Sequence, residues 1–238
     1  MPKASHQNKS DFSRLEQSLN YEFKKAELLK EALTHRSAGS KNNERLEFLG
    51  DSVLNFVIAD NLFRKDIRSS EGDLSRLRAS LVNKEGLYTI SKQLKLGDYL
   101  ILGSGELKSG GYRRESILAD TVEAIFGAVY LDSDFEQCRD LIIRLYQQLL
   151  ANIPDADSLK DPKTKLQELL QSRKLPLPVY TVIEITGQAH NQQFKMKCES
   201  EELNLIAEGH ANSRRKAEQL AAEKIISMVQ ELFKKKSS

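Results

Sequence analysis

The stretch NNERLEFLGD (42–51) places three acidic residues in a segment that otherwise has the pattern of a buried helix. Leucine and phenylalanine stand between the acids, and further apolar residues follow directly. Glu44, Glu47 and Asp51 occupy positions i, i+3 and i+7, which share one face of a helix at 3.6 residues per turn. The sequence therefore predicts a largely apolar helix with an acidic face, and the role of that face bears on what the chain does.

A second helix has the same character. In RESILADTVEAIFGAVYLD (114–132), Asp120 and Glu123 stand three residues apart among apolar residues. Like charges that are buried together are strongly unfavourable without a counter-charge. If the two acidic faces meet, a cation must lie between them, and the lack of His and Cys in both motifs favours Mg²⁺ or Mn²⁺. The alternative is that both faces are solvated, with Arg45 or Arg113 as ion-pair partners.

Two glycines, Gly50 and Gly127, interrupt these helices. A glycine inside a helix costs about 1 kcal/mol relative to alanine, so each position needs a compensating reason. Close packing of two helices is the favoured explanation. The close approach of a ligand or a partner chain is the alternative.

The composition of the 238 residues is that of an ordinary globular protein, with 39% hydrophobic and 29% charged residues. No apolar run reaches the roughly 20 residues of a membrane span, and MPKASHQNKSDF (1–12) lacks the apolar segment of a secretion signal. Cys138 and Cys198 have neither disulfide nor metal-ligand spacing. We therefore expect a cytoplasmic protein with reduced thiols, no membrane contact and no small-molecule cofactor.

Helical periodicity dominates the first 150 residues, with Gly and Asn at the breaks. The stretch GSGELKSGGYRRES (103–116) has the composition of a Gly-rich, charged loop. We predict an all-α domain over residues 11–133, with a trailing helix to about residue 151. The expected helices lie near residues 11–19, 26–33, 43–65, 71–79, 83–93, 115–131 and 134–150.

The pattern changes after a polar stretch with two prolines, which we expect to be a linker over residues 152–160. Residues 161–232 read as a helix with Asp161 as its cap, three strand-like segments and an Ala-rich helix. This order predicts a small α+β (α-β-β-β-α) domain with its helices on one face of the sheet. Residues 161–238 carry 13 Lys and Arg against 10 Asp and Glu, a weak indication of a polyanionic partner.

Four segments resemble the sequence blocks of bacterial ribonuclease III, in the same order along the chain. The resemblance implies an all-α nuclease domain that works as a homodimer with a catalytic valley across the subunit interface, followed by a double-stranded-RNA-binding domain. It implies hydrolysis of duplex RNA to 5′-phosphate and 3′-hydroxyl ends, in the processing of rRNA precursors and some mRNAs and tRNAs. The segments are NERLEFLGDSVL (43–54), EGDLSRLRASLVN (71–83), LGSGELKSGGYRRESILADTVEAIFGAVYLD (102–132) and DPKTKLQELLQ (161–171).

The resemblance also implies roles for single residues. Glu44 matches a supporting acid near the scissile strand or the subunit interface, and Glu71 matches an acid on the rim of the valley. Phe48 matches an aromatic residue that makes a dimer contact by fitting a socket on the partner subunit. The metal-binding acids of the family match Glu47, Asp51, Asp120 and Glu123.

Hydrolysis of a phosphodiester needs a nucleophile from water, charge relief at phosphorus and help for the leaving oxygen. Two divalent ions about 3.5–4 Å apart can supply all three. We expect Glu47, Asp120 and Glu123 to be the principal metal ligands, since carboxylates stay ionised at neutral pH. Asp51 is expected to complete the site and orient the water. We expect Asp51 and Glu123 to be the catalytic residues.

Duplex RNA is recognised by its shape, through 2′-hydroxyls in successive minor grooves and the phosphates between them. Lys108, Arg113 and Arg114 belong either to a phosphate-contacting rim of the nuclease, which the resemblance favours, or to a plain surface loop. The expected contacts of the second domain are Thr164, Gln167 and Glu168 on its first helix, His190 in the turn GQAHN, and Arg214, Arg215 and Lys216 at the start of its last helix.

Two other functions stay open at this point. A regulator that binds duplex RNA without cutting it would use the same fold, but it has no need of four repelling carboxylates. A metal-dependent phosphohydrolase for small substrates would have no use for the basic second domain. We therefore expect a metal-dependent endoribonuclease specific for double-stranded RNA.

Overall fold

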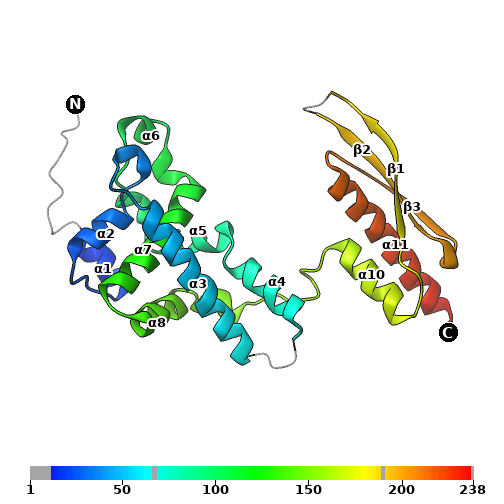
Figure 1. The fold of residues 1–238 in the computed structure, drawn as a ribbon, viewed down its shortest axis with the longest axis horizontal. Coiled ribbons are helices and arrows are strands. Elements are labelled where there is room, and N and C mark those ends of the chain that lie inside the picture. Colours follow the sequence, from blue (N-terminus) through cyan, green and yellow to red (C-terminus); the bar gives the residue numbers. More distant parts are fainter. Residues whose placement is uncertain (1–11, 66–68, 189–190, 237–238) are drawn as a thin grey trace. The chain divides into compact units, whose positions relative to one another are not determined.

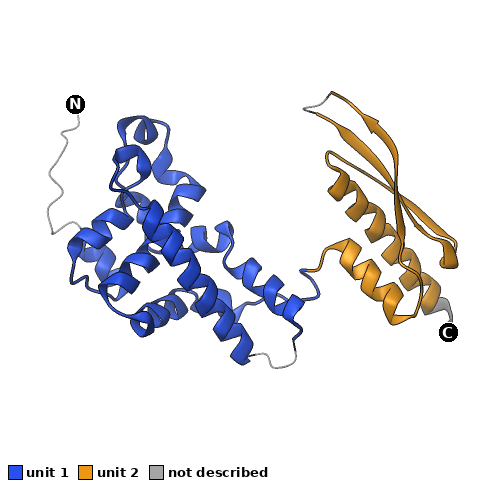
Figure 2. Ribbon diagram, viewed as in Figure 1, with its two compact units in different colours: residues 1–159 blue, residues 160–238 orange. Residues whose placement is uncertain are grey.

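The structure, a computed structural model, describes residues 12–65, 69–188 and 191–236. It divides into two compact units, residues 1–159 and 160–238, which Figure 2 colours separately. Within the described ranges, no helix combines the length and the apolar character that crossing a membrane requires.

Unit 1 is helical, which confirms the all-α prediction (Figure 1). Short 3₁₀ turns connect its helices: η1 (Arg36–Ala38), η2 (Leu96–Asp98) and η3 (Gly111–Arg113). The helices are α1 (Ser13–Leu19), α2 (Ala26–Ala32), α3 (Glu44–Lys65), α4 (Glu71–Leu81), α5 (Lys84–Gln93), α6 (Ser104–Lys108), α7 (Glu115–Asp132), α8 (Phe135–Leu145) and α9 (Gln147–Ala151).

Polar side chains mark where several of these helices begin. Ser70, Asn83 and Asp134 precede α4, α5 and α8, and each accepts a hydrogen bond from a backbone N–H in the first turn of its helix. Such caps satisfy N–H groups that have no partner inside the helix.

Helix α7 lies at the centre of unit 1. Most of its residues are buried, and α3, α5, α2 and α8 pack around it. A helix that is apolar nearly all round is stable only in such a position. Helix α3 packs most extensively against it, with Leu46, Val53 and Leu54 turned inward.

The C-terminal end of α7 is tied to the beginning of the domain. Asp132 is buried and accepts hydrogen bonds from the Tyr21 hydroxyl at 2.8 Å and from the backbone N–H groups of Lys24 and Lys25 at 2.8 and 2.9 Å. A buried carboxylate is tolerated when donors surround it in this way.

Two details of unit 1 differ from the expected elements. The helix expected over residues 134–150 is interrupted at Tyr146, between α8 and α9. The Gly-rich stretch expected to be a loop contains the short helix α6 and the turn η3. Glu106 of α6 forms an ion pair with Arg114 at 2.9 Å. Because Arg114 lies outside α6, the helical pattern of the sequence does not indicate this contact.

Unit 2 has the predicted α-β-β-β-α order. Its elements are α10 (Pro162–Ser172), β1 (Val179–Thr186), β2 (Gln193–Ser200), the 3₁₀ turn η4 (Glu201–Leu203), β3 (Leu205–Ala211) and α11 (Arg214–Lys236). The strands form an antiparallel sheet in the order β1-β2-β3. Tyr180 pairs with Cys198, and Cys198 pairs with Ala207 across the next strand.

One face of the sheet carries the core of unit 2. Met196, Cys198 and Ala207 are buried, and α11 packs on β2 and β3 while α10 packs on α11. At Gly209 of β3, an added Cβ would lie 2.0 Å from the carbonyl oxygen of Ala217, so helix and strand meet backbone to backbone there. The helices therefore cover one sheet face, as the sequence predicted.

Candidate functional site

The crossing of α3 and α7 brings the two acidic faces together. At Gly50, an added Cβ would lie 1.8 Å from the carbonyl oxygen of Glu123, and at Gly127 it would lie 2.2 Å from that of Leu46. Only glycine allows two helix backbones to approach so closely. Of the two explanations for these glycines, the structure supports close helix packing. Each glycine lies about one turn from an acid, so the packing also sets the distance between the acids.

Three carboxylates converge at this crossing. Glu47 comes from α3, Asp120 and Glu123 come from α7, and one carboxylate oxygen of each lies within 4.8 Å of the others. Oxygens that share a small divalent cation at about 2.1 Å lie at most about 4.2 Å apart. The cluster has nearly this size, and its all-oxygen donor set suits a hard cation. It can hold a metal ion after small side-chain rotations.

The three carboxylates line a cleft with a volume of about 660 Å³, and Glu44 and Asp51 of α3 border the same cleft. Asp51 is exposed, and Asn55 donates a hydrogen bond to its Oδ1 at 2.8 Å. Glu44 is exposed as well, and its carboxylate lies 3.6 Å from the Arg36 guanidinium. Asp51 and Glu44 thus lie beside the three converging carboxylates rather than among them.

The electrostatics of the cleft favour a bound cation. Burial, together with the neighbouring charges of Asp51, Glu47 and Asp120, raises the pKa of Glu123 to about 8. Burial also raises the pKa of Glu47, with added repulsion from Asp120, and burial raises the pKa of Asp120. Carboxyl groups that hold protons so strongly lack a counter-charge, which a divalent cation would supply.

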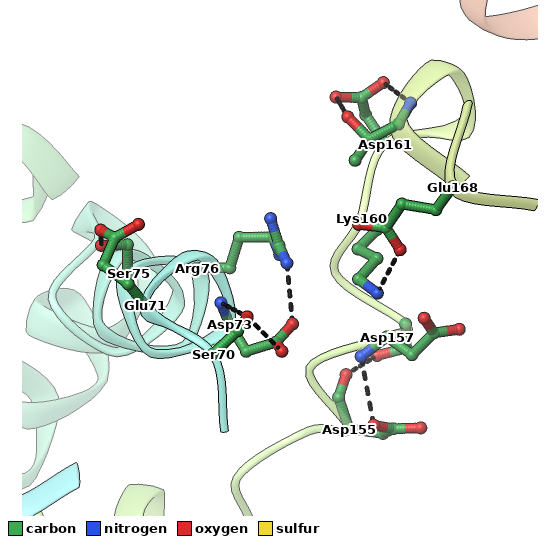
Figure 3. A network of polar contacts seen from close by, with 12 residues as sticks. Ser70, Glu71, Asp73, Ser75, Arg76, Asp155, Asp157, Lys160, Asp161 and Glu168 are labelled. Atoms are coloured by element: carbon green, nitrogen blue, oxygen red, sulfur yellow. Dashed lines mark hydrogen bonds and ion pairs between the residues drawn. The ribbon is translucent and has the colours of Figure 1, made fainter. Parts of the chain in front are cut away.

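On α10 of unit 2, the residues expected to contact RNA differ in their surroundings. Thr164 donates its hydroxyl to Asp161, the capping residue of the helix, which also accepts its N–H. Gln167 is exposed. Glu168 is exposed and forms an ion pair with Lys160 at 2.6 Å (Figure 3). His190 lies outside the described residues.

The beginning of α11 presents three basic residues. The side chains of Arg214, Arg215 and Lys216 are exposed, and Arg214 lies 3.0 Å from Glu218. The hydroxyl of Ser213 accepts the N–H of Lys216 at 3.3 Å. Cations beside free N–H groups at a helix start favour the binding of phosphate.

Comparisons with known proteins agree with this geometry. A family model described as ribonuclease-III-like matches residues 25–149, and one described as double-stranded RNA binding motif matches residues 162–229. Ribonuclease 3 of Shewanella frigidimarina is 57% identical over 216 residues, which cover 91% of this chain and 96% of that protein. The chain belongs to the ribonuclease III family.

The same relationship holds for a second relative and for a solved structure. Ribonuclease 3 of Actinobacillus pleuropneumoniae is 56% identical over 90% of this chain and 96% of its own length. The nuclease domain of Campylobacter jejuni ribonuclease III, solved with attention to flexibility in its dimer-forming region, matches with a TM-score of 0.57 and 47% identity. It covers 58% of this chain and 97% of its own. The predicted family and fold are confirmed: the chain is a ribonuclease III, an endoribonuclease for double-stranded RNA.

The ribonuclease III cleft also contains residues that sequence reasoning missed. His35, Arg36 and Ser37 border it at η1. Outside the cleft border, the charge of Lys84 of α5 lowers the pKa of both Asp120 and Glu123, against the larger effect of burial. The residues near η1 follow no helical or strand period, so no periodicity could have selected them. They are held at the cleft by contacts with residues that are distant in the sequence. One example is the hydrogen bond from the Gly103 N–H to the Ser37 hydroxyl at 3.0 Å.

The three basic residues of the Gly-rich stretch take different positions. Arg114 borders the cleft and pairs with Glu106, which also borders it. Arg113 lies over the ring of Tyr112, and Lys108 is exposed at the end of α6. One of the three therefore lies at the acidic cleft itself.

Two other residues singled out by the resemblance lie apart from the three carboxylates. Phe48 borders the cleft and is 78% exposed. Glu71 begins α4, accepts the Ser75 hydroxyl at 2.8 Å (Figure 3) and borders a separate, mainly apolar groove with Phe56 and Phe63. Within the described part of this single chain, Glu71 is not among the residues that border the acidic cleft.

The raised pKa of Glu123 gives a prediction for this ribonuclease III without divalent cations. Between pH 4.5 and about 8 the unfolded chain ionises Glu123. In the folded chain, burial and then the charges of Asp51, Glu47 and Asp120 keep the proton on this carboxyl group, while Lys84 has the opposite effect. The unfolded state then binds fewer protons, so the free energy of unfolding decreases as the pH rises through this window.

Thermal melting in chelator from pH 5 to 9 tests this expectation. In Glu123→Gln the decrease should be smaller, since the variant has no proton to lose at this position. A wild-type melting temperature that rises relative to the variant between pH 5 and 8 would contradict the assignment.

Proposed function

We propose that this ribonuclease III cleaves duplex RNA with Mg²⁺ held by Glu47, Asp120 and Glu123, and that Mn²⁺ can replace it. The observation that carries the proposal is the convergence of these three carboxylates from α3 and α7. When bound, the divalent cation relieves charge at the scissile phosphate and lowers the pKa of water. The oxygen-only donor set favours Mg²⁺ or Mn²⁺ over softer metals.

The remaining groups of the cleft have roles that follow from their positions. The exposed carboxylate of Asp51, fixed by Asn55, can accept a proton from the attacking water, which makes it a catalytic residue beside Glu123. Arg36 holds Glu44 as a supporting acid at the edge of the cleft. Because water attacks phosphorus and the 3′-oxygen leaves, the proposed products carry 5′-phosphate and 3′-hydroxyl ends.

We also propose that the enzyme works as a homodimer. Three aromatic residues along α3 are exposed: Phe48 at 78%, Phe56 at 59% and Phe63 at 71%. Exposed aromatic clusters of this kind favour a protein partner. Phe48 stands at the cleft, so a second copy covering it would complete the border of the catalytic site, and Glu71 would contribute to the rim of the valley. A monomer in sedimentation experiments at micromolar concentration would contradict this.

Incubation with long duplex RNA tests the central proposal. With Mg²⁺ we expect cleavage to short duplex products, and with excess chelator we expect none, because the carboxylates alone cannot relieve charge at phosphorus. Single-stranded RNA of the same composition is the control and should remain intact. Binding without cleavage in Mg²⁺ would instead indicate a non-cleaving regulator.

The RNA-binding domain is proposed to contact the minor grooves through Thr164, Gln167, Glu168 and His190. The exposed start of α11 is proposed to contact the phosphates between them. Arg215→Ala or Lys216→Ala should weaken duplex binding equally for all sequences and reduce the slope of log K against log salt by about 0.9, the value of one phosphate contact.

Filter or fluorescence binding from low to high salt measures this slope. Lys165→Ala on α10 is a suitable control, since it removes the same charge elsewhere in unit 2. An unchanged slope in both α11 variants would contradict the proposed phosphate contacts.

The wider setting follows from the family resemblance. We propose a nuclease domain over residues 11–133 with a trailing helix to about residue 151, a linker over 152–160 and an RNA-binding domain over 161–232. We further propose that the enzyme acts in the cytoplasm on rRNA precursors and on some mRNAs and tRNAs. Accumulation of uncut rRNA precursor in cells that lack the enzyme would support this setting, and normal maturation would oppose it.

A further inference from the structure

Glu218 is an acid in an unusual position. It lies in the second turn of α11, four residues after Arg214, and is only 7% exposed. Asp132, at 6% exposed, is similarly buried. A buried carboxylate needs partners that offset the cost of removing it from water.

The partners of Glu218 are two cations from two helices. Lys163 of α10 approaches Oε2 at 2.5 Å, and the Nε of Arg214 donates to Oε1 at 3.0 Å. Burial raises the pKa of Glu218, but the hydrogen bonds from Lys163 and Arg214 outweigh it, so the pKa lies below its ordinary value. The carboxylate is therefore ionised at neutral pH and connects the beginnings of α10 and α11.

The two cations are held in place but are not enclosed. The Lys163 ammonium also lies 4.4 Å from the centre of the Tyr180 ring, which fixes it from a second side. The side chain of Lys163 is 36% exposed and that of Arg214 is 62% exposed. Both can therefore contact a ligand while Glu218 restricts their rotamers.

The neighbouring cations are not restricted in this way. In the described part of the chain, no hydrogen bond or ion pair joins the side chains of Arg215 and Lys216 to Glu218, and the charge of Arg215 acts instead on Asp161. A long basic side chain loses rotamer freedom when it binds a phosphate, and a side chain that is already ordered loses less. The beginnings of α10 and α11 thus present two cations that Glu218 orients, Lys163 and Arg214, beside two that it does not, Arg215 and Lys216.

We infer that Glu218 is a positioning residue for RNA binding, which orients Lys163 and Arg214 toward neighbouring phosphates of the duplex. The inference rests on the proposed function, in which the start of α11 contacts phosphate. It predicts a change in RNA affinity opposite to the one that charge alone predicts. By charge alone, removing a carboxylate from an RNA-binding surface should strengthen binding. If Glu218 acts by orientation, removing it should weaken binding.

Glu218→Gln in the full chain tests this sign, because glutamine keeps the shape and removes the charge. Binding to a duplex longer than about 16 base pairs is measured in chelator over a range of salt. We expect a dissociation constant about five to ten times higher, with a salt slope lower by one to two contacts at about 0.9 each. Binding that is equal to or tighter than wild type would overturn the inference.

The salt slope keeps the test decisive if the variant is less stable. Under a purely structural role, the folded fraction below the melting temperature makes the same contacts and keeps the wild-type slope. Glu223→Gln is the matched control, an exposed acid on the same helix. It should bind at least as tightly as wild type, and an equal loss in both variants would overturn the inference.

A double variant separates the inference from the proposed function. Lys163→Gln with Arg214→Gln should weaken binding, and adding Glu218→Gln to it should change nothing further, since the residue acts through both cations. If the double variant binds like wild type, the proposed phosphate contacts and the inference both fail. If the double variant is weakened but Glu218→Gln alone is not, only the inference fails.

Discussion

Replacing Glu123 with glutamine is expected to abolish cleavage of duplex RNA and to leave duplex binding at the wild-type level. Glu123 converges with Glu47 and Asp120, and its raised pKa shows how strongly the site lacks positive charge. Glutamine keeps the shape but is a poor ligand for a hard cation. A metal that stabilises the transition state by several kcal/mol accounts for a factor of about 10³ or more in rate, at 1.36 kcal/mol per tenfold.

Single-turnover cleavage of a labelled duplex in Mg²⁺ measures this loss, and binding in chelator measures the affinity. Glu115→Gln is a matched control, because Glu115 begins the same helix, is exposed and does not border the cleft. It should cut like wild type. Cleavage by Glu123→Gln at the wild-type rate would refute the metal assignment.

Replacing Gly50 with alanine is expected to destabilise the nuclease domain by about 3 kcal/mol or more and to remove activity. The added methyl group would lie 1.8 Å from the carbonyl oxygen of Glu123. A backbone carbonyl cannot avoid this clash by changing rotamer, as a side chain can. The helices α3 and α7 must therefore separate. Because Glu47 belongs to α3 and Glu123 to α7, separation also increases the distance between the proposed metal ligands.

Thermal melting and cleavage assays with Mg²⁺ measure both effects. Gly105→Ala provides the comparison, since no atom lies within 4 Å of the added Cβ and alanine favours a helix over glycine. Its stability should be equal to wild type or slightly higher. Gly50→Ala with a wild-type melting temperature would mean that the helices do not cross as closely as the structure shows.

The acidic helices illustrate what the sequence alone could predict. Their apolar periodicity predicted both helices, and the spacing of Glu47, Asp51, Asp120 and Glu123 placed the acids on faces that could meet. The same pattern could not state which acids converge, because that depends on how the helices cross. The crossing is set by contacts between backbones, at Gly50 for example, and amphipathic spacing contains no information about them.

The segments without periodicity were harder to predict. His35 and Arg36 border the cleft where the chain just before η1 is held by Ile101, whose carbonyl oxygen accepts the His35 N–H at 3.0 Å. Helix α6 forms in a Gly-rich stretch of low helix propensity, where Arg114 pairs with Glu106. Such long-range contacts override local propensity.

The hydrogen bonds of Asp132 limit how far the protein can be shortened from its beginning. Deleting residues before Ser13 would leave these donors of the carboxylate in place, whereas a chain that starts after Lys25 would leave a buried carboxyl group at the C-terminal end of α7 without them. Because α7 also carries Asp120 and Glu123, this truncation would loosen the helix that holds two of the three converging carboxylates.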